Sequence, residues 1–312
     1  MKNNILSGLT VGIVALPLSM ALAIATGVPP QLGLYTAIIA GFFAAILGSS
    51  KINISGPTAA FVVILIPIVQ KFGISGLLVC GLLSGIILIL IGLFKLGTLI
   101  ELIPYPVTVG FTSGIAVVIA TFQIKDFFGL SIENFSGSYL DKIYLLFISF
   151  PTLKTSELLT GLFTLTLLIL WQKTKSKIPS ALIALSFSTV IVAFFNYYIP
   201  NMNISTIAST FQYSINGLEG NGIPPIPLQF SLPWSYLKME EINLDLFYAL
   251  LPHSIAIAIL GALESLLCAV ISDGMTGNKT DPNKELIGQG ITNIIVPFFG
   301  GIPATAAIAR TV

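Results

Sequence analysis

The feature that most constrains the fold is a succession of apolar runs, most of them long enough to cross a lipid bilayer. A membrane-spanning helix needs about 20 predominantly apolar residues. Of the 312 residues, 55% are hydrophobic and 9% are charged, whereas a soluble domain has about 25% charged residues. We therefore predict an all-α membrane protein. Its apolar segments are 8–25, 31–48, 57–70, 75–94, 107–124, 156–172, 179–199, 244–271 and 286–300, with a tenth helix expected to begin at Pro303.

The distribution of lysines predicts the orientation. The first apolar run, from about Ile5 to Ala25, has no small-residue cleavage site, so we expect it to remain as the first helix. A cytoplasmic N-terminus assigns eight lysines to the cytoplasm and five to the outside, as the positive-inside rule favours. The cytoplasmic set is Lys2, Lys51, Lys95, Lys173, Lys175, Lys177, Lys279 and Lys284, and the external set is Lys71, Lys125, Lys142, Lys154 and Lys238. The predicted location is the inner or plasma membrane, crossed many times.

Two polar stretches are expected outside the membrane. Segment 126–155 is predicted to contain an amphipathic helix near Tyr139–Phe150, and segment 201–243 is predicted to be an external loop between two halves. Cys80 and Cys268 both lie in apolar spans, so we expect them to be packing residues rather than disulfide partners.

Two short motifs interrupt the apolar pattern in a similar way. They are Ser55-Gly56-Pro57-Thr58-Ala59-Ala60 and Gly301-Ile302-Pro303-Ala304-Thr305-Ala306-Ala307. Proline favours the first position of a helix, where the next N–H groups lack partners and carry partial positive charge. Glycine- and proline-interrupted segments at matching places in two halves indicate a transporter's binding site. We expect Pro57 and Pro303 to begin half-helices whose ends face one another and hold an anion.

Spacing supports an internal repeat. Pro17 precedes Pro57 by 40 residues, and Glu264 precedes Pro303 by 39. Superposing the two later prolines puts Pro17 opposite Leu263. Seven helices, an odd number, would make the second unit cross the membrane in the opposite sense, which places a site near the midplane. Segments 1–200 and 244–312 are the expected repeats, and the second is predicted to stop after its third helix has begun.

Arg310 and Glu264 are the charged residues expected inside the membrane. An intramembrane charge costs at least about 2.5–3.5 kcal/mol, which makes it a functional candidate. Arg310 is predicted two turns into the tenth helix, where its planar fork suits oxyanions; alternatively, it reaches to the cytoplasmic surface. Burial disfavours ionised Glu264 while a nearby Arg310 favours it. Glu264 is therefore suited to carry a proton or cation; alternatively, it forms a structural ion pair with Arg310 or a hydrogen bond to amides of a broken helix.

The expected charge balance favours an anion. Each helix N-terminus offers about +0.5 charge, so two ends and Arg310 together supply about +2 before Glu264 is counted. Thr58 and Thr305 follow their prolines closely and could add hydroxyl donors, or could cap their own helices.

Other chemistry finds little support in the sequence. The single histidine, His253, is expected to be structural, and Asp273 is expected to cap a cytoplasmic turn. We find no metal-ligand cluster, nucleophile elbow or phosphate loop, so we predict neither an enzyme nor a bound cofactor. The formal net charge of +1 with no basic run gives no indication of a nucleic-acid partner.

Five segments carry a recognisable pattern: Gly8–Pro17, Gly33-Leu34-Tyr35, Ser55-Gly56-Pro57, Pro104–Phe111 and Gly300–Arg310. Together they resemble the motifs of the SulP anion transporter family, also called sulfate permeases, across essentially the whole chain. The resemblance implies fourteen helices in two inverted repeats of seven, with helices 1–4 in a core domain and helices 5–7 in a gate domain. It also implies an elevator-like movement, a homodimer and usually a cytoplasmic STAS domain; the chain is expected to lack that domain and the last four helices.

The resemblance also implies the site. It places the anion between helices 3 and 10, with helix 1 lining the same pocket. Sodium-coupled members have Asp at the position of Glu264 and a hydroxyl one turn later, where this chain has Cys268; we therefore favour proton coupling over sodium. The residues implied to bind substrate are Ser19, Leu22, Thr58, Ala59, Ala60, Ala304, Thr305, Ala306 and Ala307. Arg310 joins this set because of its charge, acting by direct contact or as a local positive field.

Three functions remain open at this point. The first is a secondary transporter of sulfate-type anions, bicarbonate or dicarboxylates, among which the sequence does not decide. The second is a nucleobase–cation symporter of the same fold, which binds a neutral base and is disfavoured by Arg310. The third is an anion channel-like member, in which the same site would gate or sense voltage.

Overall fold

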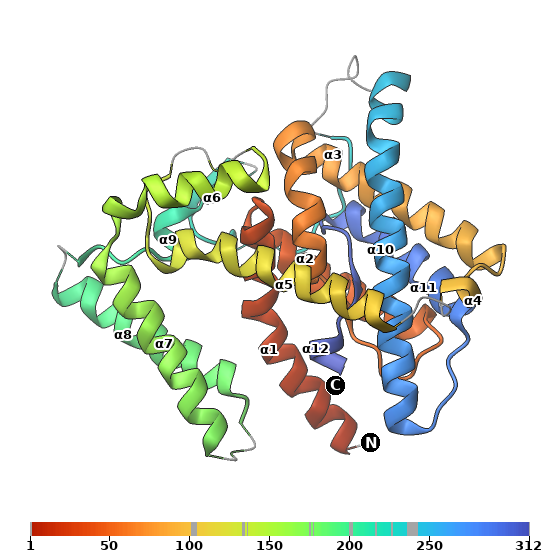
Figure 1. Ribbon diagram of the computed structural model, residues 1–312, viewed down its shortest axis with the longest axis horizontal. Helices are drawn as coiled ribbons and strands as arrows, with labels where there is room; N and C mark the ends of the chain where they lie inside the picture. Colours follow the sequence, from red (N-terminus) through yellow and green to blue (C-terminus); the bar gives the residue numbers. More distant parts are fainter. Residues whose placement is uncertain are drawn as a thin grey trace. The chain divides into compact units, whose positions relative to one another are not determined.

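The protein is described by a computed structural model (Figure 1). The structure describes residues 2–100, 105–132, 135, 137–174, 176, 178–199, 202–215, 217–225, 227–235 and 243–311. Lys175, Lys177 and Lys238 of the predicted charge pattern lie outside these residues. The chain forms two compact units, one of Met1–Val14 with Ala116–Ile223 and the other of Ala15–Ile115 with Pro224–Val312. The expected grouping of helices into core and gate stays a prediction.

Helices dominate both units. The α-helices are α1 (Lys2–Thr26), α2 (Pro30–Leu47), α3 (Ala59–Leu93), α4 (Gly97–Ile100), α5 (Tyr105–Phe127), α6 (Tyr139–Ile148), α7 (Thr155–Lys173), α8 (Ser180–Tyr198), α9 (Ile207–Thr210), α10 (Leu244–Thr276), α11 (Pro282–Ile295) and α12 (Ile308–Thr311). Two 3-10 turns, η1 (Phe150–Thr152) and η4 (Val296–Phe299), follow α6 and α11. Within the described ranges, six helices are long and apolar enough to cross a membrane.

A break in α3 divides it into two helices. Gly73 has φ 67° and ψ −169°, a conformation outside the helical region. Glycine adopts positive φ without steric cost, so it can reverse the chain here. The sequence predicts separate helices at 57–70 and 75–94, and the structure confirms the break between them.

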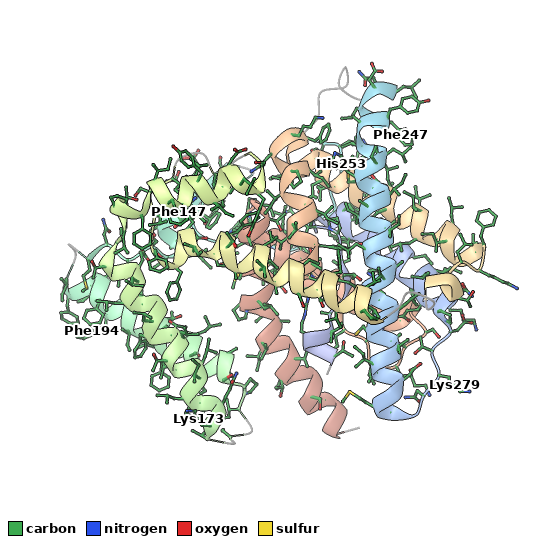
Figure 2. The ribbon with its side chains drawn as sticks, in the orientation of Figure 1. Phe147, Lys173, Phe194, Phe247, His253 and Lys279 are labelled. Carbon is green, nitrogen blue, oxygen red and sulfur yellow. The ribbon has the colours of Figure 1, made fainter. Side chains whose placement is uncertain are left out.

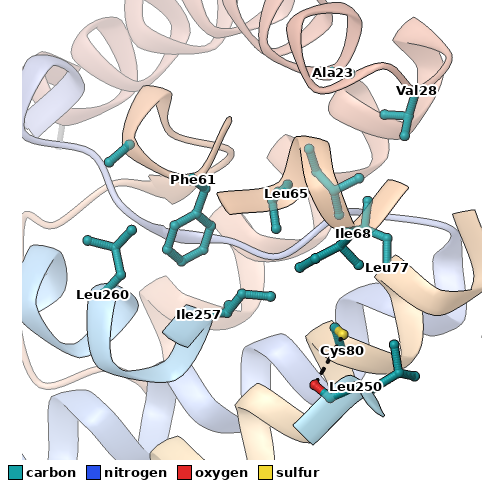
Figure 3. Close-up of a cluster of buried hydrophobic side chains, with 12 residues drawn as sticks. Ala23, Val28, Phe61, Leu65, Ile68, Leu77, Cys80, Leu250, Ile257 and Leu260 are labelled. Carbon is teal, nitrogen blue, oxygen red and sulfur yellow. Dashed lines mark hydrogen bonds between the residues drawn. The ribbon is translucent and has the colours of Figure 1, made fainter. Parts of the chain in front are cut away.

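The second unit contains the larger hydrophobic core. Phe61, Leu65 and Ile68 from the first part of α3 meet Leu250 and Ile257 of α10 there (Figure 3). Cys80 and Cys268 are both buried and free, as predicted. The Cys80 thiol donates a hydrogen bond to the Leu250 carbonyl oxygen, with a sulfur–oxygen distance of 3.7 Å (Figure 3).

Small residues allow the helices of this unit to pack closely. A Cβ added at Gly85 of α3 would lie 2.6 Å from the Gly290 oxygen, and one at Gly290 of α11 would lie 2.7 Å from the Gly85 oxygen. In lipid, where apolar helices gain little from leaving the solvent, such close backbone approach is a main source of association. α11 is thereby held directly against α3.

The first unit contains the predicted external amphipathic helix. This helix, α6, is followed by η1, and α7 and α8 lie side by side (Figure 1). The Thr164 and Ser188 hydroxyls join α7 to α8 at 2.7 Å. On α6 the Phe147 ring, labelled in Figure 2, is exposed, whereas Lys142 is buried with its ammonium 4.6 Å from the Phe122 ring centroid.

Two short strand pairs were not expected from the sequence. Strands β2 (Gln212–Ile215) and β3 (Leu218–Asn221) form an antiparallel hairpin within the segment predicted as an external loop. Strands β1 (Ser55–Gly56) and β4 (Thr305–Ala306) form the other pair and bring the two interrupted motifs together.

Candidate functional site

The two interrupted motifs meet as an antiparallel strand pair in the second unit. Ser55 is opposite Ala306 and Gly56 is opposite Thr305, and the Ala307 N–H donates to the Ile54 oxygen at 2.9 Å. Backbone that leaves the helical path at membrane depth must find partners within the protein. Each motif supplies those partners for the other. We refer to this strand pair and the residues flanking it as the crossing.

The prolines do not occupy the first helical positions that the sequence predicts. Thr58 is the N-cap of α3, so Pro57 precedes the helix, which begins at Ala59. Pro303 lies before strand β4, and α12 begins only at Ile308. Proline disfavours helical conformation in the residue before it, and extended chain accommodates both prolines without that conflict.

The strand register also changes the expected repeat alignment. Matching Ser55 with Thr305, the first residues of the two strands, places Pro17 opposite Leu267. The sequence-based superposition of prolines placed it opposite Leu263. The two prolines stand on opposite sides of their strands, Pro57 after β1 and Pro303 before β4, and the internal repeat itself stays a prediction.

Arg310 is buried at the crossing. It is the third residue of α12, not two turns into a helix as expected. Its Nη2 donates to the Pro57 oxygen, and a Cβ added at Gly56 would lie 2.6 Å from Nη1. The side chain is 8% exposed, and its Nε has no hydrogen-bond partner within the described part of the chain. The alternative of a side chain that reaches the cytoplasmic surface is therefore wrong.

Glu264 of α10 faces the start of α3. Its Oε2 accepts a hydrogen bond from the Thr58 hydroxyl at 2.9 Å. The alternative, a direct ion pair with Arg310, is absent among the described residues, because the guanidinium binds the Pro57 oxygen instead. Thr58 gives no side-chain hydrogen bond to its own helix, so its hydroxyl leaves the first N–H groups of α3 uncapped.

Thr305 anchors strand β4 to α10. Its hydroxyl donates to the Gly261 oxygen at 3.0 Å and lies 2.9 Å from the Ser265 hydroxyl. Both interactions hold the backbone in place, and neither caps α12. The role of Thr305 as a substrate ligand stays a prediction.

The remaining predicted substrate residues lie on three segments. Ala60, Ala304, Ala306 and Ala307 are buried, whereas Ala59 is exposed. On α1, Ser19 is fully buried, and its Oγ has no hydrogen-bond partner within the residues that the structure describes. Leu22, also on α1, is partly buried, and its oxygen accepts from the Thr26 hydroxyl at 2.8 Å.

The sequence analysis missed three residues of α11 that support the crossing. Glu285, Gln289 and Asn293 are all buried, and their side chains bind the segments that lead into β1 and β4. Their spacing of four residues places them on one helix face, which is the signal that could have identified them. The sequence analysis treated 286–300 simply as an apolar span and therefore did not identify this polar face.

Comparisons with known proteins agree with this arrangement. The model of the sulfate permease family matches residues 1–312. The chain is 43% identical to the Bacillus subtilis protein named "Putative sulfate transporter YvdB", over 99% of this chain and 55% of that protein. It is 29% identical to the "Bicarbonate transporter BicA" of a Picosynechococcus species, over 100% of this chain and 53% of that protein. The chain thus spans about half the length of these relatives.

Solved structures share the fold. The transmembrane domain of a cyanobacterial bicarbonate transporter, BicA, matches with a TM-score of 0.80 and 27% identity, over 98% of this chain and 74% of that chain. The murine Solute Carrier 26 family member A9 anion transporter, in the inward-facing state, matches with a TM-score of 0.75 and 18% identity, over 98% of this chain and 51% of that chain, and it supports the fold alone. The family model, the relatives and the crossing of two interrupted helices lead to one assignment: this chain belongs to the sulfate permease family.

Proposed function

We propose that this chain carries the anion-binding site of a secondary active transporter for small inorganic or organic anions. The observation that carries the proposal is the buried guanidinium of Arg310 beside the uncapped start of α3. A buried charge is costly. The Glu264 carboxyl attracts the guanidinium of Arg310 but forms no direct ion pair with it among the described residues, so an anion bound beside the guanidinium would compensate its charge further. The first N–H groups of α3 add a partial positive charge directed at the same place.

The substrate ligands in this proposal are mainly backbone groups and Arg310. Ala59 and Ala60 at the start of α3, and Ala304, Ala306 and Ala307 around β4, have side chains too small to keep an anion away from the main chain. Ser19 contributes a buried hydroxyl that has no hydrogen-bond partner among the residues described. Positive charge on the α12 side comes from the guanidinium of Arg310.

Glu264 is the proposed coupling residue. Its carboxyl group accepts a hydrogen bond from the Thr58 hydroxyl at the start of α3. A proton bound to the carboxyl group would therefore change the charge next to the anion. Cys268, one turn later on α10, offers a poor ligand for sodium. We infer proton coupling, an elevator-like movement and a homodimer, in the plasma membrane with a cytoplasmic N-terminus.

Equilibrium binding tests the site directly. The purified chain is titrated in lipid nanodiscs with labelled sulfate, bicarbonate and succinate, and we expect at least one to bind. Hydrogen bonds from a charged group contribute about 1.5–3 kcal/mol, so Arg310→Gln should weaken binding about tenfold to a hundredfold. Lys71→Gln, which removes an exposed cation on α3, should leave binding unchanged. Binding that both variants retain equally would refute the role of Arg310.

Uptake into liposomes tests coupling. Proton and sodium gradients are imposed separately, and we expect accumulation of the bound anion with the proton gradient. Glu264→Gln should remove that accumulation while equilibrium binding persists. Uptake driven only by sodium would reject proton coupling. Displacement of the labelled anion by uracil would favour the nucleobase symporter, and anion current without accumulation would favour a channel.

A further inference from the structure

A stripe of three buried polar residues runs along one face of α11. Glu285, Gln289 and Asn293 follow one another at intervals of four and are 4%, 2% and 0% exposed. A helix buried between others normally presents apolar side chains, because a buried polar group is costly unless it is hydrogen-bonded. The side chains of all three residues form hydrogen bonds with the crossing or with the loop that leads into it.

Asn293 and Gln289 bind the chain immediately before β4. The Asn293 amide pairs with Ala304 in both directions, accepting from its N–H and donating to its oxygen, each at 2.8 Å. Gln289 Nε2 donates to the same oxygen at 2.8 Å. The Gln289 oxygen accepts from the Ser55 hydroxyl in β1 at 2.9 Å. One side chain therefore binds both β1 and the residue that precedes β4.

Glu285 binds the loop that leads into the first motif. Its Oε2 accepts from the N–H groups of Ser49 and Ser50 at 2.7 and 2.8 Å, and its Oε1 accepts from Asn53 Nδ2 at 2.9 Å. These residues connect α2 to β1. The carboxylate thus fixes the loop from which the first strand departs.

The crossing needs this support because its own ladder is short. β1 and β4 contain two residues each, so the ladder alone leaves the flanking backbone groups without partners. From Ala304 the chain passes through β4 to α12 and Arg310, and from Ser55 it passes to Thr58 and α3. A shift at either attachment would move the groups of the proposed site.

We propose that Glu285, Gln289 and Asn293 are positioning residues that set the spacing between the start of α3 and the guanidinium of Arg310. This inference rests on the proposed anion site and names the part of the fold that fixes its dimensions. The three side chains act through the backbone of the two motifs and are not themselves proposed to touch the anion.

The test compares isosteric variants with a matched control on the same helix. Asn293→Leu and Gln289→Met remove the amides at similar volume. Thr292→Val is the control, because Thr292 is equally buried but its hydroxyl donates to Gly288 of its own helix, at 2.8 Å, and to no other described residue. Sulfate and bicarbonate binding is measured at temperatures where each variant is folded, together with hydrogen exchange of segment 301–307.

We expect Asn293→Leu and Gln289→Met to weaken binding about tenfold to a hundredfold per folded molecule, since a displacement of about 1 Å in a positioned site can cost about a hundredfold. Exchange in 301–307 should become faster in both, and Thr292→Val should change neither quantity. Lower melting temperatures with unchanged affinity would reduce the stripe to a structural role and overturn the inference. If the unchanged protein binds no anion, the proposed function fails; unaltered exchange in the variants would then overturn the inference separately.

Discussion

The guanidinium of Arg310 donates a hydrogen bond to the main-chain oxygen of Pro57, a residue 253 positions earlier in the chain. Pro57 lies immediately before the N-cap of α3, so this bond fixes a positive charge at the point where the helix begins. Gly56 makes the approach possible, because a Cβ at that position would occupy the space of the guanidinium. The charge of Arg310, the start of α3 and the lack of a side chain at Gly56 therefore depend on one another.

Gly56→Ala is therefore expected to displace Arg310 and weaken anion binding. The new methyl group would lie 2.6 Å from Nη1, closer than nonbonded carbon and nitrogen atoms approach. We expect an affinity loss of about tenfold or more, since each tenfold corresponds to about 1.4 kcal/mol. Gly41→Ala is the control, because its Cβ would lie at an ordinary 3.8 Å from the Ser55 oxygen. Equal affinities of the two variants would contradict this role of Gly56.

Thr58→Val is expected to separate coupling from binding. The valine keeps the shape of threonine but leaves the Glu264 carboxyl without its hydroxyl donor, and loss of one buried partner costs about 1–3 kcal/mol. Proton-driven uptake should fall more than equilibrium affinity, and Thr58→Ser should restore it. Ser254→Ala serves as control, since Ser254 lies ten residues before Glu264 on α10 and bonds to Leu250 and the Cys80 thiol. Equal losses from Thr58→Val and Ser254→Ala would exclude a specific contribution from Thr58.

The membrane helices and the interrupted motifs could be predicted because their signals are local. Long apolar runs locate both ends of α2, α7 and α8 to within one residue, whereas α1 begins six residues earlier than predicted. Gly73 lies in the gap predicted between two helices. Arg310 and Glu264 were identifiable because a charge inside an apolar span has few structural uses. These inferences needed only neighbouring residues.

The crossing could not be predicted because its partners are distant in sequence. Nothing near Ser55 indicates that it pairs with Ala306, so two short extended segments were interpreted as helix starts. The same limit applies to Gln289, whose oxygen accepts from a hydroxyl 234 residues away. The spacing of the polar stripe is local, but its purpose depends on what the fold places beside it.

Gly33→Ala is expected to destabilise the second unit severely. Gly33 of α2 lies against α1, where a Cβ would collide with the Ser19 carbonyl oxygen and crowd the Ala23 methyl at 2.9 Å. Overpacking costs about 1–3 kcal/mol and sometimes more, and a main-chain oxygen cannot rotate away. Gly12→Ala lies in α1, where no described atom outside the neighbouring backbone of its own helix comes within 4 Å of the added Cβ. It should instead be neutral or stabilising by about 0.5–1 kcal/mol. Melting temperatures in detergent provide the comparison, and similar values for both variants would refute the close contact.

The N-terminus of α6 is expected to loosen at acid pH. Ser138 Oγ accepts from the Asp141 N–H at 3.3 Å, while Asp141 Oδ2 accepts from the Ser138 N–H and hydroxyl at 2.8 and 2.7 Å. These hydrogen bonds to the charged form lower the pKa of the Asp141 carboxyl. A depressed folded-state pKa stabilises the helix above the unfolded value of about 3.9, and the contribution is lost as pH falls through the folded-state pKa.

Hydrogen-exchange protection of residues 139–143, corrected for intrinsic rates, measures this effect. We expect protection to decrease as pH is lowered from about 6 to about 3, the range that covers the unfolded pKa of a carboxyl group. Asp141→Asn should give low protection at every pH, because an amide replaces the carboxylate that binds the Ser138 N–H. Asp245→Asn, in the first turn of α10, should leave the α6 profile unchanged. An identical pH profile in the Asp141→Asn protein would show that another group controls the start of α6.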